Sequence, residues 1–283
     1  MIRRLAIVGV GLLGGSVAKA ARAHGLGAEI VGIGRDAGRL QAARRDGALD
    51  HVTTDLAEGL RDADLVVLAS PVGVIVTLLD EVAHAGGPET IVTDVGSTKA
   101  AIVRAAERLG RARPLRFVGS HPMAGSEQSG YGHARADLFR GATVVVTPTE
   151  VSEPAAVKTV SAFWETLGAG RVVTLDPDAH DRAVAAISHL PHLVAMALVD
   201  AVDRFEPSAF DIAARGFRDT TRIAASDPIV WEEIFVANRD ALGRSLVAFR
   251  EALAELERLI AAGDAAAVRA AIARIKARRE ALP

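Results

Sequence analysis

A glycine pattern near the start of the chain most limits what it can fold into. The apolar run Leu5–Val8 leads into Gly9-Val10-Gly11-Leu12-Leu13-Gly14, and helix-forming residues follow. In a strand–turn–helix unit, the first glycine permits the tight turn, the second lets a pyrophosphate approach the backbone, and the third lets the helix pack against the strand. The helix N-terminus then offers free N–H groups to phosphates. The pattern predicts dinucleotide binding by Gly9, Gly11, Leu12, Leu13 and Gly14.

Alternating strand-like and helix-like segments extend this unit into a domain. Further apolar runs are separated by stretches rich in Ala, Leu and Arg, which predicts a parallel sheet covered by helices on both faces. The runs are Ile30–Ile33, Leu65–Ala69, Ile91–Asp94, Arg116–Gly119 and Thr143–Thr147. The alternation stops near Pro148, and the residues after it are polar. We therefore expect a Rossmann-type α/β domain over residues 1–150.

The second half of the chain indicates helices. After one more strand-like run at 171–175, we expect an all-α domain over residues 151–283, with one helix from Asp227-Pro228 to about Ala262 and a last helix capped by Asp264. The long helix carries apolar residues at alternating spacings of four and three, a heptad seam. They are Leu242, Leu246, Phe249, Leu253, Leu256 and Ile260. The seam fits either packing within its own domain or packing across a subunit interface.

Composition excludes several functional classes. The 283 residues have a formal net charge of -2 and 4% aromatic residues, which argues against nucleic-acid binding. The chain has no cysteine, and without an HExxH motif we expect no metal site. The most membrane-like window, 183–202, contains His189, His192 and Asp200, so we expect a buried core helix and no membrane span. No signal peptide is recognisable, so we expect a cytoplasmic protein.

The end of the second predicted strand bears on the choice of cofactor. NAD-binding sites normally place an acid there for the ribose 2′-OH, but Ile33 is followed by Gly34 and Arg35. An arginine at this point can pair with a 2′-phosphate. The sequence therefore favours NADP with Arg35 as a ligand. NAD stays open, because a shift of one residue would bring Asp36 into the usual acidic position.

Three more segments follow predicted strands, at the edge where open α/β sheets bind ligands. Ser70 and Pro71 follow one strand and are expected to contact the cofactor. The segment Asp94-Val95-Gly96-Ser97-Thr98-Lys99 ends the next, and Lys99 either contacts a ligand or begins a helix. His121 follows the third, where a neutral imidazole can take a proton from an alcohol whose carbon loses hydride. Ser97 can hydrogen-bond the alcohol or the nicotinamide.

The helical half adds further candidates. In Ser188-His189-Leu190-Pro191-His192, the two histidines are spaced to share one helix face. Arg218 and Arg222 precede an apolar stretch and suit a carboxylate-bearing substrate, because guanidinium binds carboxylate as a fork. We favour Arg222, since the following Ile223-Ala224 suggests that this arginine is partly buried.

Taken together, these segments resemble the prephenate/arogenate dehydrogenase family of tyrosine biosynthesis. The similarity covers about residues 5 to 262, in the order that the family shows. The matching pieces are Gly9 to Ser16, Asp94 to Lys99, Gly119-Ser120-His121-Pro122-Met123-Ala124-Gly125-Ser126-Glu127, Ser188 to His192, and Phe217 to Trp231.

The resemblance implies oxidative decarboxylation of a cyclohexadienyl acid, prephenate or arogenate, with NAD or NADP as acceptor. It implies that His121 accepts the proton of the ring hydroxyl and that Ser97 supports this hydroxyl. It places a substrate carboxylate on Arg222, and His192, His189 and Ser126 near the substrate. It also implies a homodimer through the helical domain, which agrees with the heptad seam.

Two points stay open at this stage. An acid facing the substrate's ammonium group would favour arogenate, and Asp137 and Glu127 are candidates. The nearest rival is a β-hydroxyacid dehydrogenase, whose chemistry needs a lysine in the helical domain, where only Lys158 and Lys276 occur. A non-catalytic dinucleotide-sensing protein would need the glycine turn but not Ser97, His121 and Arg222 together.

Overall fold

The computed structural model describes residues 2–111, 113, 115–126 and 128–282. The chain forms two compact units, one up to Asn238 and one from Arg239 onward.

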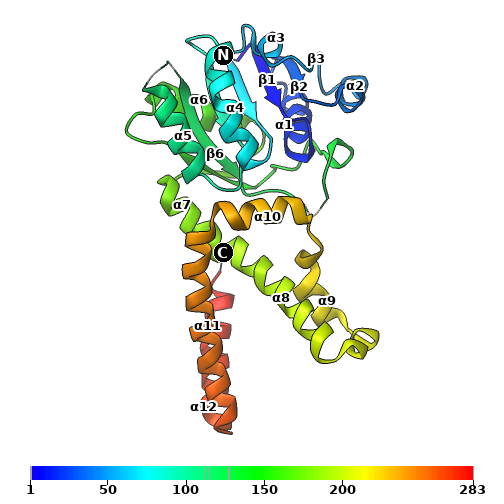
Figure 1. Ribbon diagram of the computed structural model, residues 1–283, viewed down its shortest axis with the longest axis vertical. Coiled ribbons are helices and arrows are strands. Elements are labelled where there is room, and N and C mark those ends of the chain that lie inside the picture. The colour runs from blue at the N-terminus through cyan, green and yellow to red at the C-terminus, as the bar shows by residue number, and fades with distance from the viewer. Residues whose placement is uncertain (1, 112, 114, 127, 283) are drawn as a thin grey trace. The chain divides into compact units, whose positions relative to one another are not determined.

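A twisted sheet with helices on both faces forms the centre of the first unit (Figure 1). The described residues form eight strands in the order β3-β2-β1-β4-β5-β6-β7-β8. The strands are β1 (Arg4–Val8), β2 (Glu29–Ile33), β3 (His51–Thr53), β4 (Leu65–Leu68), β5 (Ile91–Asp94), β6 (Arg116–Pro122), β7 (Thr143–Thr147) and β8 (Arg171–Thr174). The Rossmann-type fold expected from the glycine turn is confirmed.

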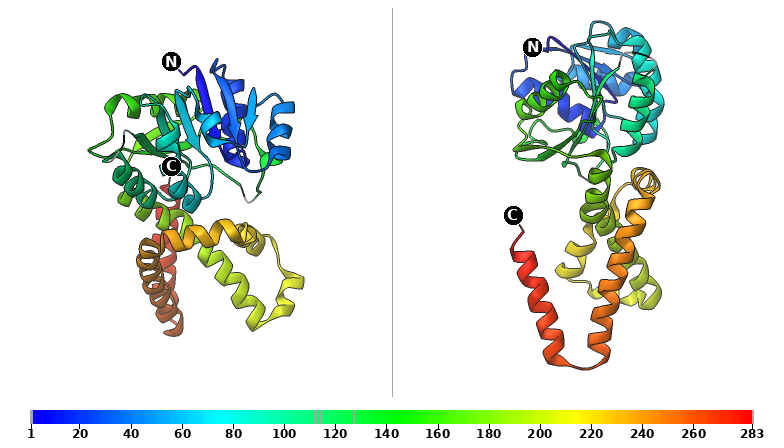
Figure 2. Two further views of the ribbon diagram at one scale, coloured as in Figure 1. Left: turned by 45° about the horizontal axis from the view of Figure 1, so that its top comes forward. Right: turned by 90° about the vertical axis from the view of Figure 1, so that its left-hand side faces the viewer.

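Two layers of helices cover the sheet, as the two views of Figure 2 show. Successive side chains of a strand point to opposite faces. Leu5 and Ile7 of β1 therefore join one buried cluster, with α1 and α6, while Ala6 and Val8 join the other, with α3, α4 and α5. These helices are α1 (Leu12–Ala23), α3 (Leu56–Leu60), α4 (Val72–Ala85), α5 (Ala100–Gly110) and α6 (Pro154–Thr166); α2 (Ala37–Arg45) follows β2.

The sheet differs from the predicted parallel sheet at β7. This strand runs antiparallel to β6, with His121 opposite Val145. The connection between them contains the 3-10 helix η1 (Tyr131–His133) and, among its described residues, no α-helix that could carry the chain back across the sheet. Instead it lies along α1, where a Cβ on Gly15 would come within 2.6 Å of the Tyr131 ring. A connection of this kind returns the chain in the opposite direction.

The sheet also extends beyond residue 150, the domain boundary expected from the sequence. β8 pairs in parallel with β7 after the crossover helix α6, so the sheet continues to Thr174. The short strand β3, pairing with β2, was not predicted. Its sequence His51-Val52-Thr53 has too few apolar residues to show a strand pattern.

A continuous helical run follows the sheet. It comprises α7 (Pro177–Val184), the π-helix η2 (Ala185–His189) and α8 (Leu190–Phe205). This run is long and apolar enough to cross a membrane, but a single helix of this kind is also found in soluble proteins. Within its most apolar window, 22% of the residues are buried. The expected buried core helix is thus wrong for the single chain, because in α8 only Ala195 is buried.

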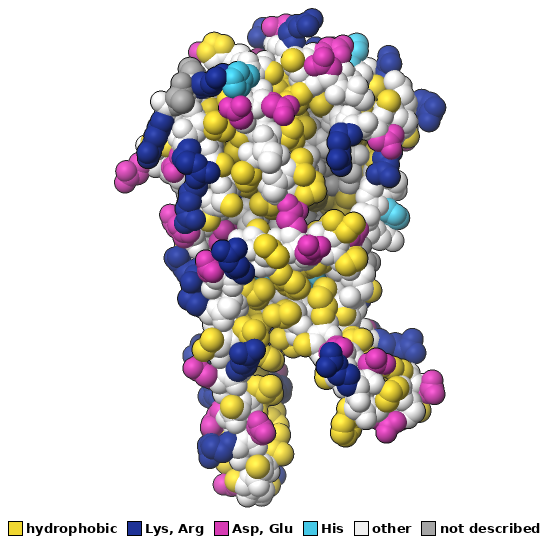
Figure 3. All heavy atoms as spheres, viewed as in Figure 1, with side chains coloured by type: hydrophobic (Ala, Val, Ile, Leu, Met, Phe, Trp, Pro, Cys, Tyr) yellow, Lys and Arg dark blue, Asp and Glu magenta, His cyan; other side chains and the backbone are white. Residues whose placement is uncertain are grey.

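The segments after α8 complete the first unit. They are the 3-10 helix η3 (Pro207–Ile212), α9 (Arg215–Thr221), the 3-10 helix η4 (Arg222–Ala225) and α10 (Pro228–Ala237). Asp227 caps α10, accepting a hydrogen bond from the Ile229 amide at 2.9 Å, as its sequence predicted. Figure 3 shows hydrophobic side chains at the surface over α10, where Ile229 is 75% exposed.

The single helix predicted from Asp227 to about Ala262 is wrong. The structure has α10 and then α11 (Arg239–Ala261), separated by Asn238 with φ −112° and ψ 24°. The Asn238 side chain is buried and donates to the Asp181 carbonyl at 2.8 Å. This contact fixes the residue where the helix is interrupted, and no local sequence pattern reveals it.

The second unit is a helical hairpin of α11 and α12 (Ala265–Glu280). Gly263, at φ +67°, makes the turn between them. The predicted cap is confirmed, since Asp264 accepts hydrogen bonds from the Ala266 and Ala267 amides. Two seam residues of α11, Leu253 and Ile260, are 53% and 68% exposed, so the hairpin presents apolar surface.

Candidate active site

The glycine turn has the geometry that a diphosphate needs. Gly9 has φ +98°, and a Cβ there would lie 2.6 Å from the Ala69 carbonyl oxygen. A Cβ at Gly14 would lie 2.0 Å from the Gly9 carbonyl oxygen, so α1 packs this closely only with glycine. At Gly11, by contrast, a Cβ would meet nothing within 4 Å. Gly11 is thus the position at which a ligand can reach the backbone.

The start of α1 suits an anion. Its N-cap is Gly11, no side chain caps the helix, and its first turn holds no acidic residue. The amides around Leu12 and Leu13 therefore keep the partial positive charge of a helix N-terminus. Ser70 and Pro71 lie next to this turn, because the Ser70 hydroxyl is only 2.8 Å from the ideal Cβ position of Gly9. These residues fit the phosphates of a dinucleotide.

The end of β2 has a charged side chain that is exposed. Arg35 follows the half-buried Gly34. Asp36 is the N-cap of α2 and accepts from the Arg39 amide at 3.0 Å, and its other oxygen lies 3.1 Å from Arg39 Nε. The acid that could have bound a ribose is therefore already engaged.

A buried ion pair holds the ends of β5 and β6 together. The Lys99 ammonium donates to the Asp94 carboxylate and, at 2.9 Å, to the Ser120 carbonyl. The same carboxylate accepts from the Gly96 and Ser120 amides. Burial lowers the pKa of Lys99, and Asp94 opposes that shift. Lys99 is 0% exposed and is the N-cap of α5, so it begins this helix and supports the loop. Ser97, between Gly96 and Lys99, is half-buried and is presented by this loop.

The His121 imidazole lies on β6, at the same edge of the sheet as the glycine turn. Its Nδ1 is 2.9 Å from Nε2 of His180, and the two rings meet edge to face at 5.1 Å. Nδ1 of His180 is in turn 2.8 Å from Oδ1 of Asp181. Burial lowers the pKa of His121 well below its usual value, and the charges of His180, Lys99 and His189 add to this. At neutral pH the His121 ring is thus neutral.

The two histidines of the predicted motif meet one aromatic ring. His192 stacks on Trp231 with ring centroids 3.6 Å apart, and His189 meets the same indole edge to face at 6.0 Å. Burial lowers the pKa of His189 to about 4. Burial also lowers the pKa of His192, and the positive charge of Arg222 contributes. The predicted shared face is confirmed, and Arg222 belongs to the same neighbourhood.

The structure places the remaining candidates less centrally. Arg222, expected to be partly buried, is exposed in η4, because its side chain lies at the surface of a short 3-10 turn. Ser126 is exposed and its hydroxyl accepts from the Gln128 amide at 3.1 Å. Asp137 forms two hydrogen bonds with Arg135, at 2.9 and 2.8 Å. Glu127, the other acid considered for the substrate's ammonium group, lies outside the described residues.

Three polar residues of this region were not predicted: His180, Asp181 and Asn238. His180 and Asp181 are adjacent on α7, and Asn238 ends α10. A histidine next to an aspartate just after a helix start was the one local signal for them. Among the described residues, no cluster of three or more His, Asp or Glu could hold a metal ion.

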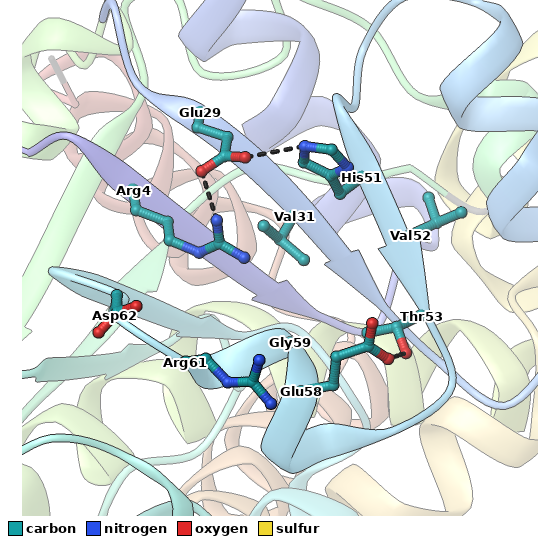
Figure 4. Close-up of a pocket in the computed structure, with 10 residues that line it drawn as sticks. All are labelled: Arg4, Glu29, Val31, His51, Val52, Thr53, Glu58, Gly59, Arg61 and Asp62. Atoms are coloured by element: carbon teal, nitrogen blue, oxygen red, sulfur yellow. Dashed lines mark hydrogen bonds and ion pairs between the residues drawn. The ribbon is translucent and has the colours of Figure 1, made fainter.

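A separate cavity of about 320 Å³ lies away from this edge of the sheet. Arg4 and Glu29, which begin β1 and β2, line it, with residues of β3 and α3 (Figure 4). Two of its side chains pair with Glu29, which binds Arg4 and, at 2.8 Å, His51. Because it lies near the starts of the strands, it is not the ligand crevice of an open α/β sheet.

Known proteins share both the sequence and the architecture. Residues 17–174 match the family described as "Prephenate dehydrogenase, nucleotide-binding domain", and residues 176–274 match "Prephenate dehydrogenase, dimerization domain". The chain belongs to the prephenate dehydrogenase family. This membership makes it an oxidoreductase and confirms the resemblance. It disfavours the β-hydroxyacid dehydrogenase and the non-catalytic sensor.

Individual relatives match over most of their length. The prephenate dehydrogenase of Bacillus subtilis is 36% identical over 257 residues, covering 89% of this chain and 68% of that protein. The cyclohexadienyl dehydrogenase of Zymomonas mobilis is 32% identical over 268 residues, covering 93% of this chain and 90% of that protein. A prephenate dehydrogenase structure from A. aeolicus, in complex with hydroxyphenyl propionate and NAD+, has a TM-score of 0.92 at 33% identity, covering 99% and 98%.

Proposed function

We propose that this chain catalyses the NAD(P)-dependent oxidative decarboxylation of prephenate, arogenate or both, giving 4-hydroxyphenylpyruvate or tyrosine. The observation that carries the proposal is the His121 imidazole. It is neutral because its pKa is well below the usual value, and it lies at the sheet edge that bears the nucleotide turn. A positioned neutral imidazole is the general base that oxidation of a ring alcohol requires.

The residues divide the chemistry between them. Gly9, Gly11, Leu12, Leu13 and Gly14, with Ser70 and Pro71, hold the dinucleotide, whose nicotinamide accepts the hydride when bound. As hydride leaves the carbon bearing the hydroxyl, His121 takes the hydroxyl proton. The bond to the ring carboxylate breaks, its electron pair enters the ring, and carbon dioxide departs. His121 then returns the proton to the phenol oxygen and ends the cycle neutral.

Other residues orient the substrate in this proposal. Ser97 hydrogen-bonds the ring hydroxyl, and Arg222 grips a carboxylate with its guanidinium fork. His192, His189 and Ser126 complete the substrate pocket. The positive charge of Arg222 is close enough to contribute to the lowered pKa of His192, which supports placing both residues in the substrate pocket.

The charge pattern at the end of β2 favours NADP over NAD. Arg35 is exposed beside Gly34, while Asp36 caps α2. A guanidinium recognises the 2′-phosphate, and the Asp36 carboxylate, whose Oδ1 caps α2 and whose Oδ2 faces Arg39, has fewer acceptor sites left for the ribose hydroxyls.

We also propose the assembly in which the enzyme works. The C-terminal family match is to a dimerization domain, and α8, α10 and α11 expose apolar residues. A homodimer through the helical part, beginning after β8, would cover them. We expect this dimer in the cytoplasm, without nucleic-acid or membrane partners.

The proposal is tested with initial rates over four combinations: prephenate or arogenate with NAD or NADP. Formation of the reduced cofactor is followed by its absorbance. The exposed His84→Asn on α4 serves as a matched control for His121→Asn. We expect turnover with at least one substrate, lowered by about 100-fold or more in His121→Asn and kept in the control. Absence of reduction in all four combinations, with a folded dimer, would contradict the proposal.

A further inference from the structure

A chain of buried polar groups leads away from His121. His121 Nδ1 contacts His180 Nε2 at 2.9 Å, and His180 Nδ1 contacts Asp181 Oδ1 at 2.8 Å. Asp181 also accepts from the Lys99 amide at 2.7 Å and from the Ala100 amide at 3.0 Å. His180 is 0% exposed and Asp181 is 6% exposed, so water does not compete for these groups.

The bonds at Asp181 determine where the protons lie. Burial would raise the pKa of Asp181, but hydrogen bonds from His180 and from the Lys99 and Ala100 amides lower it below the usual range. The ionised carboxylate only accepts, so Nδ1 of His180 holds a proton. A neutral imidazole carries one N–H, and in His180 that N–H faces Asp181. Its Nε2 is then an acceptor, which requires His121 to donate through Nδ1. Nε2 of His121 is left with a free lone pair.

The main chain of the same aspartate leads to a second imidazole. Asn238 donates through Nδ2 to the Asp181 carbonyl at 2.8 Å, and this nitrogen lies 3.1 Å from His189 Nδ1. A carbonyl oxygen only accepts, so the side-chain atom is the amide nitrogen. Nδ1 of His189 therefore accepts, and its proton is on Nε2. With a pKa of about 4, the ring is neutral at pH 7.

We propose that Asp181 sets opposite tautomers in two histidines, through His180 for His121 and through Asn238 for His189. His121 then offers a proton acceptor at Nε2, and His189 offers a proton donor at Nε2. His180, Asp181 and Asn238 are positioning residues. The roles of the two tautomers rest on the proposed function. There the ring hydroxyl needs the proton acceptor at Nε2 of His121, and a carboxylate or keto oxygen of the substrate suits the proton donor at Nε2 of His189.

The tautomers are measured directly in the full-length protein labelled with 15N-histidine. Long-range 1H–15N correlation spectra distinguish Nδ1–H from Nε2–H rings, and His121→Asn and His189→Asn assign the two signals. At pH 7.5 we expect Nδ1–H at His121 and Nε2–H at His189. A wild-type spectrum with Nε2–H at His121, or Nδ1–H at His189, overturns the proposal whatever the activity.

Three variants test the two branches separately. His180→Phe removes both ring nitrogens and should release the tautomer of His121 alone. His180→Gln should retain Nδ1–H, since its amide oxygen accepts from His121 while its amide N–H reaches Asp181. Asn238→Ala should release His189 alone. If His180→Phe leaves the spectrum of His121 unchanged in a folded protein, the His180 branch is refuted.

Kinetics provide a second readout for the same variants. We expect His180→Phe to lower kcat by about 100-fold, with the KM for substrate within about threefold of wild type, and His180→Gln to restore most of kcat. The two proposals fail separately. If the protein shows the expected tautomers but turns over neither substrate, the proposed function is contradicted and the assignment of the tautomers to Asp181 stands.

Discussion

The Asp36 carboxylate accepts a hydrogen bond from the Arg39 amide at 3.0 Å and lies 3.1 Å from its guanidinium Nε. The only acid at the end of β2 is thus committed to capping α2. Arg35, one residue earlier, is the exposed charged side chain that we propose for the cofactor. We therefore expect cofactor choice in this chain to depend on how this helix cap leaves the two side chains.

Replacing Arg35 by Ala should weaken NADP selectively. Loss of a charge-assisted hydrogen bond costs about 1.5–3 kcal/mol, which corresponds to about a 10- to 100-fold rise in the KM for NADP. The KM for NAD should change by less than about threefold, since NAD lacks the 2′-phosphate. The control is Arg44→Ala, which replaces an exposed arginine near the end of α2. Equal losses for both cofactors would refute a 2′-phosphate contact.

His121→Asn should lower kcat by about two to four powers of ten, the usual contribution of a positioned general base. Dinucleotide binding should be nearly intact, because the glycine turn holds the phosphates. Fluorescence titration with NADPH and steady-state rates measure the two effects. An undiminished kcat in a folded variant would remove His121 from proton transfer.

The buried His189 should make stability depend on pH. Its pKa is about 4 in the folded chain and about 6.5 when unfolded, so the unfolded state binds more protons and stability falls as pH drops from about 6.5 to about 4. The groups facing it are Asp181, His180, His192 and Asn238. Between pH 7.5 and pH 5, protonation of His189 should lower the free energy of unfolding by about 2 kcal/mol.

Urea unfolding at these two pH values measures this loss. His189→Asn provides the comparison, because its side-chain oxygen can still accept from Asn238 while it does not titrate. The variant should lose less stability than wild type, by about the same 2 kcal/mol. Parallel pH dependences in the two proteins would mean that His189 does not control this window.

Arg222→Ala should raise the KM for substrate by about 10- to 100-fold, with a smaller change in kcat, because it removes a bidentate contact to a carboxylate. Arg222→Lys should restore only part of the affinity, since an ammonium lacks the planar fork. Arg204→Ala on α8, an exposed arginine paired with Asp200, should have no effect. A substrate KM that stays at the wild-type value would show that another residue binds the carboxylate.

The exposed seam of α11 predicts the oligomeric state. Leu253→Asp places a charge on apolar surface that is 53% exposed in the single chain, so it should not unfold the hairpin. Sedimentation should instead show loss of the dimer, because an unpaired charge is costly to bury at an interface. Glu251→Ser, off the seam on the same helix, should remain dimeric. A monomeric wild-type protein would refute the assembly.

The parts of the fold that sequence predicted are those encoded locally. The turn from Gly9 to Gly14 and the start of α1 follow from neighbouring residues, and the apolar strands follow from burial on both faces. The direction of β7 depends instead on a connection that lies along α1, and β3 is too short to show a pattern. Neither feature has a local signature.

The site shows the same division. Ser97 and the glycine turn follow strands and His121 lies near the end of β6, so their place at one edge of the sheet could be predicted. The roles of His180 and Asn238 depend on tertiary contacts: Asn238 meets a carbonyl 57 positions away, and this contact also interrupts the predicted long helix. For Lys99 the sequence left a ligand contact and a helix start open; the structure has it as the N-cap of α5, and its burial against Asp94 is invisible in the sequence.

One unbroken run from α7 through the π-turn to α8 carries both His180 and His189. Each residue added or removed between them would rotate one imidazole about the axis by about 100° relative to the other. The proposed proton-handling roles would therefore fix the length of this stretch to the residue. Among homologues, we expect insertions and deletions to be absent from 180–189 and to collect in the 206–214 connection, where the chain leaves the helix.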